Sequence, residues 1–108
     1  MIQCICLDSK NRPEEIPMGK WISEKMKYHI THVWFHPAQG IQGCSLHEVR
    51  LGKESEPYST FRLSRFGVTL ENLEKLIEMM NACSDLNLLD ITALIRESEL
   101  EIIENYEL

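Results

Sequence analysis

The chain has 108 residues, with an apolar share of 44% and a charged share of 26%, as in an ordinary globular protein. This length fits one domain and excludes two independent cores. The sequence contains no run of about 18 apolar residues, so no membrane-spanning helix is predicted. The first seven residues lack the basic and apolar regions of a secretory signal. We therefore expect a cytoplasmic protein with reduced thiols and a single domain over residues 1–108.

Charge divides the chain into two parts. Residues 1–68 carry nine Lys and Arg against seven Asp and Glu, a net charge of +2. Residues 69–108 carry two against ten, a net charge of −8. The acidic part argues against duplex DNA or an anionic membrane as its partner, whereas the first part tolerates either. We predict no membrane partner.

The first expected strand is the short apolar run 2–7, which ends at turn-forming residues 8–11. In a strand, Cys4 and Cys6 point to the same face, and we interpret them as small buried apolar side chains. Pro13 and Pro17 then disfavour a regular helix or central strand. A connecting loop is expected around them, running over one end or along one edge of the β-structure.

Three more strands are expected over residues 27–35, 41–51 and 58–68, joined by turns at 36–40 and 52–57. In each strand the apolar residues change parity once; in the first, Tyr28 and Ile30 precede Val33 and Phe35. A β-bulge or sharp bend produces such a change. Bent strands allow a small barrel to close, so we predict an antiparallel meander forming a barrel over residues 1–68. Coverage of both sheet faces is the alternative.

From residue 69 the apolar period becomes helical. Thr69 is the expected N-cap, Glu71 suits the first turn, and Leu or another large apolar residue recurs at spacings of three and four. A second helix is expected over residues 88–103, with Asp90 as a candidate cap. The tail 97–108 interleaves five glutamates with apolar residues. We interpret it as a continued amphipathic helix that docks on its own domain or on a second copy. The fold class is α+β, with residues 69–108 as an acidic helical part.

Three histidines invite a metal hypothesis. His29, His32 and His36 are spaced by three and four residues, and Cys44 or His47 across a hairpin would complete a tetrahedral set. Strand alternation, however, places His29 opposite the other two. No zinc-site or metalloprotease spacing is present. We predict no metal and no cofactor, and a metal-dependent enzyme using these three histidines is the least favoured alternative.

Catalytic signatures are also missing from the sequence. No nucleophile motif, glycine-rich phosphate loop or recognisable pair of carboxylates is present, since the five glycines are scattered. We therefore predict a protein that is not an enzyme.

Aromatic and basic residues give the better functional lead. They suggest a stacking surface for peptide or single-stranded nucleic acid, while the alternative is that most of the rings fill a small core. The residues of this hypothesis are Trp21, Trp34, Tyr58, Phe61 and Phe66, with Arg50, Arg62 and Arg65 nearby. Trp34 should face outward if Val33 and Phe35 face inward. We predict partner contacts at five residues: Trp34, His36, Pro37, Arg62 and Arg65.

A spaced set of residues carries a resemblance over residues 1–68: Ile16-Pro17, Lys20-Trp21-Ile22, Tyr28, Ile30, Gly40-Ile41, Gly43, Pro57-Tyr58, Phe61 and Arg65-Phe66. This frame resembles small uncharacterised proteins of bacterial and prophage genomes, and its Trp21-Ile22 to Ile30 portion looks like the start of SH3-like barrels. The resemblance implies an SH3-like barrel and a phage-related or mobile-element setting. It brings no catalytic residue.

Together these patterns favour a non-enzymatic protein–protein interaction module. Its partner is unknown, and the apolar, acidic tail suggests a homodimer through the C-terminal helices. The first alternative is single-stranded nucleic-acid binding through the barrel, with the acidic tail as a charge screen.

Overall fold

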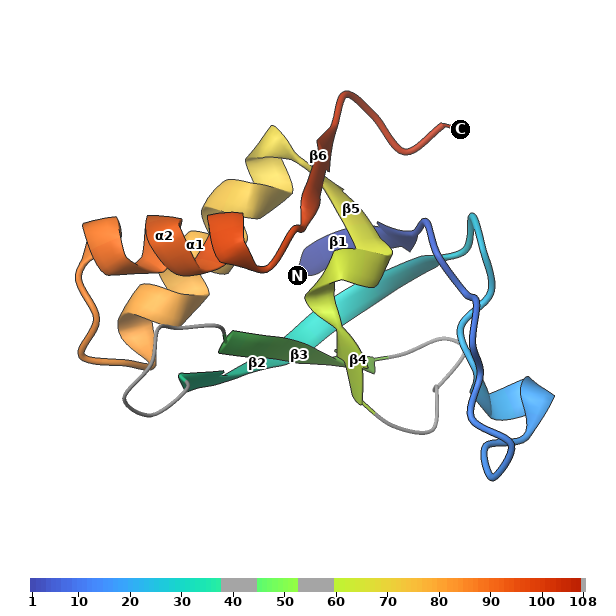
Figure 1. Cartoon of the computed structure of the whole chain (residues 1–108). Helices are drawn as coiled ribbons and strands as arrows, with labels where there is room; N and C mark the ends of the chain where they lie inside the picture. The colour runs from blue at the N-terminus through green and yellow to red at the C-terminus, as the bar shows by residue number, and fades with distance from the viewer. Residues whose placement is uncertain (38–44, 53–59, 108) are drawn as a thin grey trace.

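The computed structural model describes residues 1–37, 45–52 and 60–107. Within them a mixed sheet and two helices confirm the α+β class (Figure 1). The elements follow one another along the chain as β1 (Ile2–Cys6), the 3₁₀ turn η1 (Met18–Lys20), β2 (Lys27–Pro37), β3 (Ser45–Gly52), β4 (Thr60–Arg62), the 3₁₀ turn η2 (Leu63–Arg65), β5 (Phe66–Thr69), α1 (Leu70–Ala82), α2 (Leu88–Glu97) and β6 (Glu101–Ile103).

The sheet has the strand order β4-β3-β2-β1-β5-β6. Neighbouring strands are antiparallel except β5 and β6, which run parallel. The long strand β2 joins the two sides of the sheet, because residues 27–30 pair with β1 and residues 29–37 pair with β3. α1 packs on β1, β5 and β6, and α2 contacts α1 and β3.

The predicted closed barrel is not confirmed. β4 and β6 are the two ends of the sheet, which is open over the residues that the structure describes. The predicted bend is present in β2, where the register shifts between Ile30 and His32. In contrast, β3 pairs without interruption from Ser45 to Gly52, so a change of face within these residues is wrong. The chain after β5 adds β6 to the edge of the sheet, and the helices cover the interior instead.

The predicted strand over residues 58–68 is divided within the described residues 60–68. β4 ends at Arg62, η2 turns the chain, and β5 begins at Phe66. Phe61, Leu63 and Phe66 are all buried. The change of parity in this stretch therefore comes from a 3₁₀ turn rather than from a bulge.

Both helices begin at a side-chain N-cap, and the cap predicted for the first helix is confirmed. Thr69 caps α1, and its Oγ1 accepts a hydrogen bond from the backbone N–H of Asn72 at 3.4 Å. α2 is capped by Asn87, whose Oδ1 accepts from the N–H of Asp90 at 2.8 Å. The prediction that Asp90 caps this helix is wrong. Aspartate suits the first turn as well as the cap, because both positions favour negative charge.

The acidic tail does not continue α2 as a helix, contrary to the prediction. After α2 the chain turns at Glu99, which has a φ of 61°, and forms β6 beside β5. Gly67 permits this close packing, since a Cβ there would lie 3.1 Å from Cγ2 of Ile103 and 2.8 Å from Cδ1 of Leu7.

Tyr106 fastens the end of the tail to the sheet. Its hydroxyl donates to the carbonyl oxygen of Gln3 at 2.5 Å and accepts from the N–H of Thr69 at 3.2 Å. The tail thus docks on its own domain, one of the two predicted placements.

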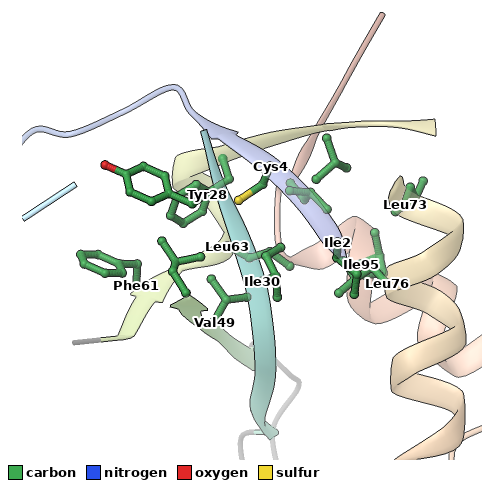
Figure 2. Close-up of a cluster of buried hydrophobic side chains, with 14 of the residues drawn as sticks. Ile2, Cys4, Tyr28, Ile30, Val49, Phe61, Leu63, Leu73, Leu76 and Ile95 are labelled. Atoms are coloured by element: carbon green, nitrogen blue, oxygen red, sulfur yellow. The ribbon is translucent and has the colours of Figure 1, made fainter. Parts of the chain in front are cut away.

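One apolar core joins the sheet and the helices. In Figure 2, Ile2 from β1 and Ile30 from β2 lie near Leu76 from α1 and Ile95 from α2. Phe61 and Phe66 also belong to this core, so these two rings fill the interior and do not form a stacking surface. The remaining buried members are Cys4, Cys6, Ile22, Tyr28, Val49, Leu51, Leu63, Val68, Leu73, Met80, Ile91 and Leu100.

Candidate functional site: an exposed tryptophan on a bent strand

The site begins with the bend in β2. Ile30 lies opposite Leu51 and His32 lies opposite Arg50, so Thr31 is the extra residue of a β-bulge. Its Oγ1 donates to the carbonyl oxygen of Arg50 at 3.0 Å, which holds the bulge against β3. Beyond the bulge, side chains that would otherwise have pointed inward point outward.

The bulge decides which residues of β2 face solvent. Val33 and Phe35 are half-buried and pack against the core, whereas His32 and Trp34 are exposed. Trp34 retains 37% of its accessible surface. The predicted outward orientation of this ring therefore agrees with the burial of its two neighbours.

Five residues form what we call the Trp34 surface: His32, Trp34, Glu48, Arg50 and Arg62. Trp34 lies opposite Glu48, Glu48 lies opposite Arg62, and His32 lies opposite Arg50. Residues directly opposite in an antiparallel pair share one face, so these side chains stand on the same side of β2, β3 and β4. The rings of His32 and Trp34 stack with centroids 5.7 Å apart and an interplanar angle of 14°.

Of the predicted partner residues, the structure brings Trp34 and Arg62 together on this surface. His36 and Pro37 end the same strand, where their backbones lie opposite Leu46 and Ser45. Their side chains lie outside the described part of the structure.

Arg65 has a different environment. Its guanidinium lies 5.0 Å from the centre of the Trp21 ring, and its Nη1 donates to the carbonyl oxygens of Lys10 at 2.8 Å and Asp8 at 3.2 Å. The Asp8 carboxylate is 3.7 Å away. Trp21 in turn meets Phe61 edge to face at 5.1 Å. Arg65 thus fastens the loop between β1 and β2 to the core.

The second half of β2 also has an unpaired edge. β1 reaches only as far as Ile30, so within the described residues no strand pairs with β2 on this side from Thr31 onward. A cavity of about 120 Å³ lies beside this edge, lined by Val33 and Phe35 of β2 and by Met79 and Met80 of α1, together with His32, Cys83 and Ser84. An unpaired edge offers backbone donors and acceptors to another strand.

The prediction that His29 and His32 point to opposite sides of the strand is wrong. The bulge returns His32 to the same side as His29, away from the core. His29 lines a polar cavity of about 580 Å³ with Thr69, Asn72 and Tyr106, among others. Among the residues that the structure describes, no three His, Cys, Asp or Glu side chains are grouped closely enough to hold a metal ion. His36 and Cys44 lie outside this test.

The thiols of β1 are buried, as predicted for Cys4 and Cys6. Burial raises the pKa of Cys6 to about 11, and burial together with the neighbouring Cys6 raises the pKa of Cys4 still further. Burial also raises the pKa of Tyr28, whose hydroxyl accepts from the N–H of Ser23 at 2.9 Å. These groups are neutral at physiological pH, which suits a structural role.

Two members of the Trp34 surface, His32 and Glu48, belong to neither the predicted stacking surface nor the predicted partner contacts, and Arg50 belongs only to the predicted stacking surface. A signal for Glu48 and Arg50 was present, because the buried residues His47, Val49 and Leu51 alternate with them. The predicted change of face in this strand conceals that alternation.

A scan against protein-family models, a search of curated proteins and a search of solved structures each found no match to this chain. Among the described residues, no helix has the length and apolar character needed to cross a membrane.

Proposed function

We propose that this chain is a non-enzymatic protein-interaction module that contacts its partner through the Trp34 surface. The observation that carries this proposal is the exposed Trp34 ring, stacked on His32 and standing among Arg50, Arg62 and Glu48. Tryptophan and arginine supply most of the binding energy at many protein interfaces. The stack also orders the ring before binding, so that less conformational entropy is lost when a partner covers it.

The unpaired edge of β2 supports the same function. A partner in extended conformation has backbone groups that complement those beyond Thr31, and its side chains would lie beside Trp34 on one face and beside Phe35 on the other. Edge and ring together define a continuous contact region. His36 and Pro37 extend this region along the chain and remain predicted contacts.

Affinity capture from an extract of the native host tests the proposal. The immobilised wild-type chain should retain a protein that the Trp34→Ala variant loses by tenfold or more. Leu89→Ala is the matched control, because Leu89 is another large exposed apolar residue and lies in α2. Equal retention by wild type and Trp34→Ala would contradict the proposal, provided that circular dichroism shows both to be folded.

Single-stranded nucleic acid is the second candidate ligand for the Trp34 surface. The stacked His32 and Trp34 rings beside Arg50 and Arg62 are features that such proteins use to bind bases and phosphates. The net charge of −6 weighs against it. Titration of labelled oligo(dT) and oligo(U) at two salt concentrations tests this candidate. Tight binding that weakens with salt and requires Trp34 would favour nucleic acid over protein.

We retain the SH3-like arrangement for residues 1–68 as part of this proposal. It is supported by the order β4-β3-β2-β1-β5, by the bend that lets β2 pair with strands on both of its sides, and by the 3₁₀ turn between β4 and β5. The phage-related setting and the cytoplasmic location remain predictions. A homodimer through the C-terminal helices is tested together with the inference below.

A further inference from the structure

A second surface lies where α1, α2 and β6 meet, and β6 is the edge strand at the opposite end of the sheet from β4. A groove of about 310 Å³ runs between them, a volume at the lower end of the range for ligand pockets. Its walls are mainly large apolar side chains. The lining residues are Leu73 and Ile77 of α1, Thr92, Ile95 and Arg96 of α2, Leu100 after α2, and Ile102 of β6.

Two apolar side chains on the elements that form this groove remain exposed, namely Ile102, which lines it, and Leu70, which begins α1. Ile102 retains 56% of its accessible surface, and Leu70 retains 61%. Leu70 precedes Ile77 by seven residues, so both lie on the same face of α1. Such exposure on neighbouring elements is typical of a surface that a partner covers.

The rim of the groove is acidic. Glu74 and Glu78 neighbour Ile77 on the surface of α1, three residues before it and one after it, and Glu99 directly precedes Leu100; all three are exposed. Glu101 is exposed as well, but it points to the face of β6 opposite the groove-lining Ile102. Arg96 is the one cation among the described lining residues. Residues 69–108 carry a net charge of −8, so this face attracts cations and repels a second copy of itself.

We infer that this groove binds a basic amphipathic helix of a partner protein. Apolar residues on one face of that helix would enter the groove between α1 and α2 and cover Ile102, while lysines or arginines on its flanks would meet the rim glutamates. The charge argument selects this occupant over a homodimer through the C-terminal helices. The inference is independent of the Trp34 surface, because the two sites share no residue.

Three synthetic peptides of 18 residues test the inference with the full chain. The first places leucines at helical i, i+3, i+4 and i+7 positions and lysines at most others. The second keeps the lysines and replaces the leucines by serine, which measures charge attraction alone. The third keeps the leucines and replaces the lysines by glutamate. Titration calorimetry near physiological salt should show the first binding at least tenfold more tightly than either of the others.

Two variants locate the binding. Ile102→Ser should weaken binding of the lysine–leucine peptide about fivefold or more, because the peptide covers a side chain that is half exposed in the free chain. Leu88→Ser combined with Leu89→Ser is the matched control, since these exposed apolar residues begin α2 and do not line the groove. The control should change the affinity less than twofold. Thermal unfolding checks that both variants remain folded.

Several results would overturn the inference. They are no binding of the first peptide, binding of the serine peptide with similar affinity, or an equal loss in Ile102→Ser and in the α2 control. Light scattering could give a further contradicting result. A wild-type dimer that becomes a monomer in Ile102→Ser would assign the groove to a second copy of the chain. Trp34→Ala should leave the peptide affinity unchanged, so failure here and failure of the Trp34 surface are separate outcomes.

Discussion

The two halves of β2 have similar residue types but different environments. Tyr28 and Ile30, before the bulge, lie in a strand with β1 on one side and are buried in the core. Trp34, after the bulge, lies in a strand with β3 as its sole described neighbour and remains exposed. Pairing on both sides and burial on one face give the first half a structural role. In the second half Val33 and Phe35 still pack against the core, and the outward face with Trp34 is the part that we propose for contact with a partner.

Two histidines of β2, one on each side of the bulge, also differ in environment. His29 lies between β1 and β3, opposite Gln3 and Gly52, and lines a cavity. His32 lies one bulge further and stacks on Trp34 at the surface. The difference arises from the position of Thr31 rather than from the chemistry of the imidazole.

The largest expected loss of stability comes from a substitution in the first half of β2, before the bulge. Ile30→Ala should lower the free energy of unfolding by about 2–5 kcal/mol, because it leaves a cavity where Ile30 packs in the core. Urea denaturation followed by circular dichroism measures this loss. A loss below about 1 kcal/mol would break the distinction between the two halves.

A pH effect should follow from the buried groups of β1 and the first half of β2. The thiol of Cys6 has its pKa raised from the usual 9.0 to about 11, and the pKa values of Cys4 and Tyr28 are raised as well. Because the folded state holds these protons more tightly than the unfolded chain, their contribution is complete below pH 9. It is lost as pH rises through 11 and beyond.

The free energy of unfolding, measured by urea denaturation, should therefore decrease as pH rises from 9 to 11, by at most about 1.4 kcal/mol per pH unit for each thiol. The double variant Cys4→Ala and Cys6→Ala is the control. Its stability should depend less steeply on pH over this range, and an unchanged slope would contradict the assignment to the thiols.

Arg62 and Arg65, which are both predicted partner contacts, should differ in their effects on stability and on partner binding. Arg65→Ala should cost about 1–2 kcal/mol of stability, since it removes the contact with Trp21 and the hydrogen bonds to Asp8 and Lys10. Arg62→Ala, on the exposed face of β4, should change stability by no more than about 0.5 kcal/mol. Thermal unfolding compares them, and partner capture should weaken more in Arg62→Ala. The reverse order in either assay would argue against the placement of the Trp34 surface.

A small effect on stability is also expected at the centre of the proposed site. Trp34→Ala should cost less than about 1 kcal/mol, because the ring is exposed and its main described ring contact is the stack on His32. The same urea denaturation as for Ile30→Ala measures it. A loss comparable with that of Ile30→Ala would make Trp34 a core residue and would remove the basis for the proposed function.

Local patterns predicted the elements well where one period dominates. The N-cap Thr69, the helical spacing after it and the buried pair Cys4 and Cys6 followed from residue types and alternation alone. The change of parity between Ile30 and Val33 correctly indicated the bend in β2. These features depend on neighbouring residues, which a sequence displays directly.

Features that depend on distant residues could not be predicted in the same way. The 3₁₀ turn after Arg62 and the bulge at Thr31 produce the same change of parity, so the pattern did not distinguish them. The tail 97–108 has apolar spacing that suits a helix, but pairing with β5 and the anchoring of Tyr106 override it. The separation of Arg62 from Arg65 likewise depends on the loop that Arg65 contacts.

Site-specific photo-crosslinking tests the central claim most directly. Benzoylphenylalanine is placed at position 34, after the bulge, and in a second protein at position 27, where Lys27 is exposed in the same strand before the bulge. After irradiation in the native host, we predict a crosslinked protein partner from position 34 and none from position 27. Equal crosslinking from both positions, or a product from position 27 alone, would contradict the assignment of the second half of β2 as the binding surface.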